Sequence, residues 1–291
     1  FVLIPANDSP IALIHAIEAS SWRHWPFESR TYSGWQEMEA ELGELLDGCT
    51  RLAMEVSPGA AVPTLDYLPA GMAGLILNLG VEAVSSGDLV SRFHSVWTPK
   101  QLEMHRQAAE IVADVARQAF TRAAASAESG SPTNEGDLSE WIHSQLRAYG
   151  LTVNPGCIVA VGKTAADPHY SPEGKGETIA EGDLLLIDLW GAFHGAVFAD
   201  QTWMGLLDSK VDSRTQEIWN AVRDARDAAI TFLREQFESG VEVRGYEVDQ
   251  VARALITDRG YGDYFVHRTG HSMDIDLHGS GPNLDNLETR D

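Results

Sequence analysis

The chain has 291 residues, of which 44% are hydrophobic, so it can bury a sizeable core, is not expected to be disordered, and is long enough for two domains. Its formal net charge of −22 argues against nucleic acid and anionic membranes as partners, because both attract basic surfaces. No apolar run approaches the ~20 residues of a membrane span, and Cys49 and Cys157 are too few for a disulfide framework, which is typical of a cytoplasmic protein.

Residues 1–96 are predicted to form a mixed α/β domain. The sequence begins on a strand pattern without an initiator methionine, so this domain is expected to be incomplete at its start. The segment from Ser85 to Trp97 is taken as the domain boundary. The expected elements are strands at Phe1–Ile4, Ile11–Ile17, Leu52–Val56 and Val81–Val84, and helices at Trp35–Leu46 and Ala70–Leu79.

Residues 97–291 are predicted to form a second domain in which helix pairs alternate with antiparallel strands, an α+β arrangement. Thr98-Pro-Lys-Gln101 has the pattern of a capping box with proline at the first helical position, and Ser213-Arg-Thr-Gln216 is a second capping box. The expected elements are helices from Thr98 to Phe120, at Asp137–Tyr149, from Ser213 to about Phe237 and at Gly245–Arg259, a loop from Ala123 to Gly136, and strands at Cys157–Val161 and Tyr264–His267.

Two further strands, Leu184–Trp190 and Val197–Trp203, flank His194-Gly195 and are predicted to form a β-hairpin. If the turn centres on His194, Asp188 and Asp200 face each other directly. Directly opposed residues have Cβ atoms about 4.5–5.5 Å apart, and like charges at that distance repel. Two carboxylates held in this way favour cations between them, and paired metals lie about 3.5–4 Å apart.

Four histidines lie in predicted loops or at their edges. His169 precedes the hairpin in sequence, and three others lie late in the chain, at His267, His271 and His278. Carboxylate oxygens and imidazole nitrogens are ligands that suit Mn, Co, Zn or Fe, so the sequence predicts a metal cluster. The alternative interpretation is structural, with the aspartates as solvated strand ends and the histidines as turn or loop residues. His105 and His143 lie on predicted helices and are interpreted as structural.

These motifs together resemble the creatinase/aminopeptidase family with the "pita-bread" fold, which includes methionine aminopeptidase, aminopeptidase P and prolidase. The resemblance covers residues 98–291, and the first domain resembles the smaller domain that precedes the catalytic domain in Xaa-Pro-specific members. It implies an α+β pita-bread catalytic domain. The strings that carry it are Asp167-Pro-His169-Tyr, Ile187-Asp188-Leu-Trp, Phe198-Ala-Asp200-Gln-Thr202-Trp, and His267-Arg-Thr-Gly-His271 followed by His278-Gly.

The resemblance implies two divalent metal ions, Mn or Co first, with Zn or Fe as alternatives. Asp188 would bind one metal, Asp200 would bridge both, and His271 would bind the second. The nucleophile would be a bridging hydroxide, because a divalent metal lowers the pKa of bound water towards neutrality.

The remaining histidines would serve the substrate. His169 and His278 would contact the scissile amide and the tetrahedral intermediate, and His267 resembles an additional imidazole of Xaa-Pro members. The implied activity is that of an exopeptidase that hydrolyses the N-terminal Xaa-Pro bond of peptides or dipeptides. A homodimer is expected, because a neighbouring subunit's first domain caps the cleft in similar proteins.

Two departures from the family pattern limit these expectations. The family completes its site with two glutamates, which would lie beyond Asp291, so the catalytic domain is expected to be truncated and the chain metal-poor and inactive as given. Asp274 stands where relatives have glycine, which suits a positive φ better than aspartate does. Two alternatives stay open: a metal-independent creatinase-type C–N hydrolase, and a non-catalytic binding protein on the same fold.

Overall fold

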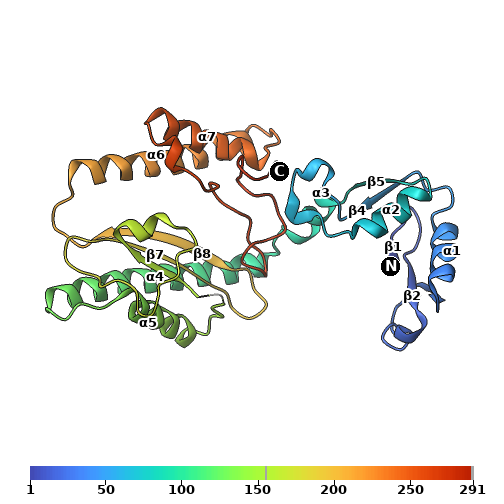
Figure 1. The fold of residues 1–291 in the computed structure, drawn as a ribbon, viewed down its shortest axis with the longest axis horizontal. Coiled ribbons are helices and arrows are strands. Elements are labelled where there is room, and N and C mark those ends of the chain that lie inside the picture. Colours follow the sequence, from blue (N-terminus) through green and yellow to red (C-terminus); the bar gives the residue numbers. More distant parts are fainter. Residues whose placement is uncertain (155, 290–291) are drawn as a thin grey trace. The chain divides into compact units, whose positions relative to one another are not determined.

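The computed structural model describes residues 1–154 and 156–289, so the last two residues of the predicted second domain lie outside the described residues. The chain divides into two compact units (Figure 1). The N-terminal unit comprises Phe1–Ala60 and Thr64–Ser86, and the larger unit comprises Ala61–Pro63 and Gly87–Asp291. Within the described ranges no helix has both the length and the apolar character needed to cross a membrane.

The N-terminal unit is a mixed α/β structure. β1 pairs antiparallel with β2, whereas β2–β3 and β4–β5 are parallel pairs. Leu13 and Val81 belong to its core, together with residues of both helices. Its elements are β1 (Val2–Leu3), β2 (Ile11–His15), β3 (Glu28–Tyr32), α1 (Trp35–Leu45), β4 (Arg51–Met54), α2 (Ala70–Asn78) and β5 (Glu82–Ser85). Strand β3 was not predicted because its sequence, Glu-Ser-Arg-Thr-Tyr, has no apolar alternation.

The larger unit contains the antiparallel sheet β6-β7-β8, with α4 packed on β7 and β8 and α5 packed on β6. Helices α6 and α7 pack against each other (Figure 1). Their facing side chains form a separate apolar cluster. The α+β class is therefore confirmed. The elements are α3 (Gly87–His94), α4 (Pro99–Glu128), α5 (Glu135–Ala148), β6 (Ile158–Val161), β7 (Leu184–Gly191), β8 (Ala199–Leu206), α6 (Ser213–Glu238) and α7 (Gly245–Asp258).

The alternation of side chains in β7 positions the candidate site. Leu185, Ile187 and Leu189 are fully buried in the core shared with α4 and α5. Successive strand residues point to opposite faces, so Asp188 and Trp190 lie on the other face, which lines a cavity. Residues of the core face therefore hold the carboxylate of Asp188 towards the cavity.

Several predicted helix and strand boundaries were wrong. Helix α4 continues to Glu128, into the predicted loop, because its last turns are rich in alanine, the strongest helix former. The N-cap of α6 is Asp212, not Ser213, since the Asp212 carboxylate accepts hydrogen bonds from two backbone N–H groups. The predicted boundary segment contains α3, and the predicted strand at Tyr264–His267 is a 3₁₀ turn at Gly262–Tyr264 followed by irregular chain.

The predicted buried face of α6 is also only partly correct. Ala225 and Ala229 are buried, but Ile218, Val222 and Leu233 are 40%, 58% and 43% exposed. The reason is geometric: α6 packs against α7 through a stripe of alanines, and small side chains allow a close contact that the larger residues beside the stripe do not enter.

Candidate metal and substrate site

The hairpin brings Asp188 and Asp200 to one face of the sheet, but not directly opposite each other. Asp188 pairs with Thr202, and Asp200 pairs with Trp190, so the predicted direct pairing was wrong. The strands close at Gly191 and Ala199, which places the centre of the connection one residue beyond His194. A shift of two residues preserves the face, and diagonal neighbours of this kind lie about 7–8 Å apart.

The Asp188 carboxylate is in an environment that disfavours its charge. Burial raises its pKa, the nearby negative charge of Asp200 raises it further, and the pKa reaches about 6. A hydrogen bond from the Thr202 hydroxyl to Oδ1, 2.8 Å long, acts in the opposite direction. A cation between the two carboxylates would offset both unfavourable effects.

His271 faces Asp200 across the cavity. Its Nε2 lies 3.3 Å from Oδ2 of Asp200, and this hydrogen bond raises the pKa of the imidazole despite its partial burial. Its Nδ1 lies 2.9 Å from the carbonyl oxygen of Ser272, which can only accept, so Nδ1 carries a hydrogen. In the neutral ring the lone pair is then on Nε2, the atom directed at the carboxylate. This is the tautomer that a metal ligand needs.

His278 lies beside His271, with ring centroids 4.5 Å apart in an edge-to-face arrangement. Partial burial lowers the pKa of His278, and the neighbouring His271 lowers it further. A neutral imidazole at this position can donate one hydrogen bond and accept another. His278 is thus chemically distinct from His271, although only seven positions separate them.

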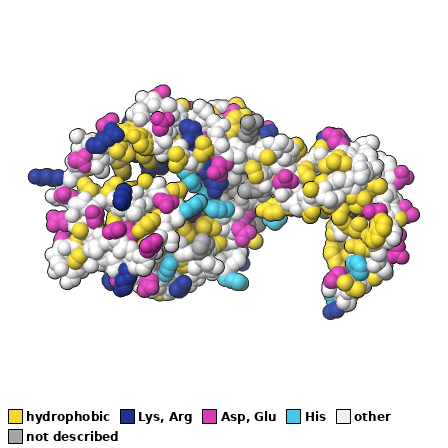
Figure 2. All heavy atoms as spheres, viewed as in Figure 1, with side chains coloured by type: hydrophobic (Ala, Val, Ile, Leu, Met, Phe, Trp, Pro, Cys, Tyr) yellow, Lys and Arg dark blue, Asp and Glu magenta, His cyan; other side chains and the backbone are white. Residues whose placement is uncertain are grey.

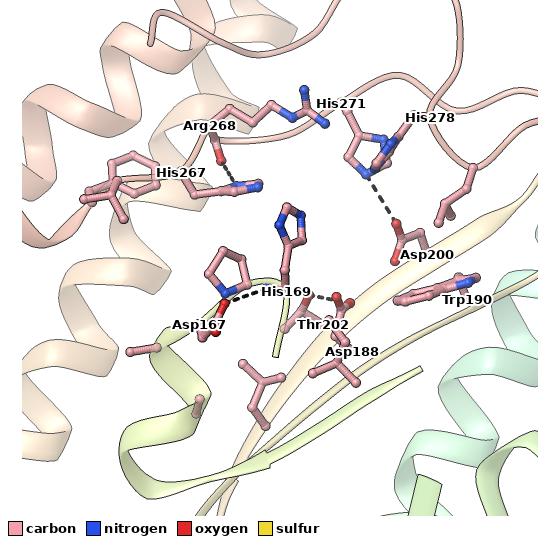
Figure 3. Close-up of a pocket in the computed structure, with 18 of the residues that line it drawn as sticks. Asp167, His169, Asp188, Trp190, Asp200, Thr202, His267, Arg268, His271 and His278 are labelled. Carbon is pink, nitrogen blue, oxygen red and sulfur yellow. Dashed lines mark hydrogen bonds and ion pairs between the residues drawn. The ribbon is translucent and has the colours of Figure 1, made fainter. Parts of the chain in front are cut away.

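All six predicted site residues line one cavity of about 540 Å³. Figure 2 shows histidine side chains gathered at a hollow in the surface of the larger unit. In Figure 3 the aspartates rise from the strands, His169 projects from the loop after β6, and the other histidines enter from the opposite side. The roles assigned to them remain predictions. The six predicted site residues that line the cavity are Asp188, Asp200, His169, His267, His271 and His278.

His169 and His267 lie on exposed parts of their loops. The backbone N–H of His169 donates to Oδ1 of Asp167 at 2.9 Å, which closes the Asp-Pro-His turn. Nδ1 of His267 lies 2.9 Å from the carbonyl oxygen of Arg268. The ring atoms facing the cavity are therefore free of protein hydrogen bonds in the described part of the chain.

Two buried carboxylates, Glu135 and Asp249, hold the walls of this cavity and were not predicted. Glu135 accepts hydrogen bonds from the backbone N–H groups of Val161 and Glu177 at 2.9 and 2.8 Å, and from the Tyr170 hydroxyl at 2.7 Å. It therefore ties down the loop that carries His169. The hydrogen bond to Glu135 and burial raise the pKa of Tyr170 to about 12.

Asp249, on α7, holds the histidine loop, which we define as residues 265–271, through Thr269. The only sequence signal was a carboxylate beside the apolar residues of a predicted helix, at Asp249 next to Val248. Glu135 gave no signal, because it lay in the segment predicted to be a loop.

The other predicted structural histidines have partners. Nδ1 of His105 lies 2.7 Å from the carbonyl oxygen of Phe198, and Nε2 of His143 accepts from the N–H of Cys157 at 2.8 Å. Neither lines the cavity. Both brace strand ends from helices α4 and α5.

Asp274 is not strained, although it stands where relatives have glycine. It does not have a positive φ, since Ala60 is the non-glycine residue with positive φ in the described chain. Its buried carboxylate accepts from the N–H groups of Asp276 and Ser280 at 2.7 and 3.0 Å. It organises the turn that leads to His278.

The cavity offers part of what a divalent cation requires. Two carboxylates and an imidazole Nε2 face one cavity, and this chemistry fits Mn, Co, Zn or Fe. Among the described residues, however, no three His, Cys, Asp or Glu side chains form a group close enough to hold a metal ion. The residues present are therefore part of a ligand set and leave coordination positions open.

Comparison with known proteins shows the family of the chain. The model of metallopeptidase family M24 matches residues 103–291. The Xaa-Pro dipeptidase of Lactobacillus delbrueckii subsp. lactis is 36% identical over 121 residues, which cover 42% of this chain and 30% of that protein. The probable dipeptidase PepE of Mycobacterium tuberculosis strain H37Rv is 26% identical over 286 residues, which cover 95% of this chain and 69% of that protein.

Solved structures give the same fold. The dipeptidase PepE from Mycobacterium ulcerans has a TM-score of 0.69 at 20% identity, covering 99% of this chain and 73% of that chain. The Xaa-Pro dipeptidase from Bacillus anthracis has a TM-score of 0.61 at 22% identity, covering 99% and 75%. The sequence match thus spans less than a third of the Lactobacillus relative, while the predicted pita-bread fold is confirmed. The chain belongs to metallopeptidase family M24.

Proposed function

We propose that this peptidase chain carries metal- and substrate-binding residues of a dinuclear exopeptidase that cleaves the N-terminal Xaa-Pro bond of peptides or dipeptides. The observation that carries the proposal is the placement of Asp188, Asp200 and His271 around one cavity with three accessory histidines. The relatives named Xaa-Pro dipeptidase support the same substrate class.

Within this proposal, Asp188, Asp200 and Nε2 of His271 hold the divalent cations. When bound, the cations would act as Lewis acids and would lower the pKa of bound water towards neutrality. The chain's own residues orient the substrate: His278 offers a neutral imidazole to the scissile amide, and His169 and His267 line the side from which the peptide enters. Manganese or cobalt as the metal, a homodimer and a cytoplasmic location are further parts of the proposal.

The test is cleavage of a panel of Xaa-Pro dipeptides and tripeptides by purified protein with Mn²⁺ or Co²⁺, and with chelator as the control. Metal-dependent release of the first residue is the result that the proposal predicts. Cleavage of a C–N bond that chelator does not affect would favour the creatinase-type alternative. Partner binding that Asp200→Asn leaves unchanged, without peptide cleavage, would favour a binding protein.

A further inference from the structure

Asp249 lies in the middle of α7 and is fully buried, with 0% of its surface exposed. Its neighbours in α7 include the buried apolar residues Val248 and Ala252. A buried carboxylate is costly unless it is paired and hydrogen-bonded. The hydrogen-bond partners of Asp249 therefore indicate the role of its buried charge.

Both carboxylate oxygens of Asp249 are used. Oδ1 accepts from the backbone N–H of Thr269 at 2.9 Å and from the Thr269 hydroxyl at 2.7 Å. Oδ2 accepts from Nε of Arg253 at 2.8 Å, one helical turn later. Nη2 of Arg253 also donates to Oδ1 at 3.2 Å, so Oδ1 holds the histidine loop and both oxygens hold the arginine.

Arg253 contacts the same loop at its beginning. Its Nη1 donates to the carbonyl oxygen of Phe265 at 2.7 Å, and its Nη2 donates to that of His267 at 2.9 Å. The guanidinium also lies 4.2 Å from the centre of the Phe265 ring. The loop has no helix or strand of its own, so these contacts from α7 supply the order that secondary structure would otherwise supply.

The next residues lead directly to the cavity. Gly270 and Leu284 exchange backbone hydrogen bonds of 3.2 and 3.0 Å, and His271 then faces Asp200. We propose that Asp249 and Arg253 are a positioning pair that fixes where His267 and His271 enter the cavity. The positioning of the loop is independent of the proposed function. Only the roles of the two histidines, in binding metal and substrate, rest on it.

The test compares Asp249→Asn with Glu135→Gln as a matched control. Both remove the charge of a fully buried carboxylate in the larger unit, and both retain an oxygen acceptor. Glu135, however, holds the loop of His169 and not the histidine loop. Hydrogen exchange of the peptide covering residues 265–271 and the affinity for Co²⁺ alone by calorimetry are measured on folded protein, with thermal melting as the check of folding.

For Asp249→Asn we expect faster exchange over residues 265–271 and Co²⁺ binding weakened about tenfold, the effect typical of residues that orient metal ligands. For Glu135→Gln we expect faster exchange over residues 161–177 and unchanged Co²⁺ affinity. Exchange over 265–271 that matches wild type in Asp249→Asn overturns the inference, as does equal weakening of Co²⁺ binding in both variants. A wild-type protein that binds no Co²⁺ would contradict the proposed function, and the exchange comparison would still decide the role of Asp249.

Discussion

Nε2 of His271 and Oδ2 of Asp200 lie 3.3 Å apart, although the two residues belong to an irregular loop and to a β-strand that are distant in sequence. The carbonyl of Ser272 fixes the hydrogen of the imidazole on Nδ1, so the atom directed at Asp200 is the one that can bind a metal. When Nε2 carries no hydrogen, the carboxylate and the imidazole would present the atoms of a ligand pair to a cation.

The first prediction concerns Asp188. Its pKa is raised from 3.8 to about 6, so the folded metal-free protein binds this proton more tightly than the unfolded chain does. The proton on Asp188 therefore stabilises the folded state. Its contribution to the free energy of unfolding is fully present below pH 3.8 and is lost as the pH rises through about 6. Asp188→Asn should therefore stabilise chelator-treated protein at neutral pH, by up to about 3 kcal/mol.

Denaturant unfolding on both sides of this pH interval measures the effect. Wild type should lose stability towards neutral pH relative to Asp188→Asn, and Mn²⁺ or Co²⁺ should reduce or reverse the difference. An Asn variant that is less stable than wild type in chelator at neutral pH would show that the Asp188 carboxylate is well solvated or compensated.

The second prediction concerns Asp274. Asp274→Gly removes three hydrogen bonds that the buried carboxylate accepts, from the N–H of Asp276 and from the N–H and hydroxyl of Ser280, two residues that flank His278. We expect a loss of stability of about 1–3 kcal/mol and a fall in kcat/KM of roughly tenfold or more, because small displacements near the chemistry are costly. Asp276→Asn is the control, because the contribution of Asp276 is its backbone N–H. Equal kinetics for both variants would contradict a role for Asp274 in placing His278.

The third prediction concerns Gly245, the first residue of α7. A Cβ at this position would overlap the backbone carbonyl of Asn283, next to the bridge between Gly270 and Leu284. Gly245→Ala should therefore lower the free energy of unfolding by about 1–3 kcal/mol, the typical effect of overpacking. It should also disturb the histidine loop. Gly71→Ala in α2 meets no atom within 4 Å and should be neutral or stabilising. Similar melting temperatures for the two variants would contradict this packing.

Part of this structure could be predicted from the sequence. The α+β class followed from helix pairs and a strand hairpin, and the six cavity residues followed from motif strings. The register of Asp188 could not be predicted, because the sequence does not fix where a seven-residue connection, 192–198, turns. An error of one residue in the centre moved the partner by two and kept the face, so Asp188 and Asp200 still line one cavity.

Other features depend on tertiary contacts that periodicity does not encode. Glu135 lies in a segment predicted to be a loop, and Asp249 is an ordinary residue of a predicted helix. The importance of both appears only with the loops that donate to them. The exposed face of α6 has a similar cause, because apolar spacing predicts which residues share a side and not which of them α7 contacts.

The most direct test of the central claim is anomalous diffraction at the cobalt edge from crystals of the natural protein soaked in Co²⁺. We predict anomalous density bounded by the carboxylates of Asp188 and Asp200 and by Nε2 of His271. Ordered cobalt at other residues, with none between these three side chains, would contradict the account.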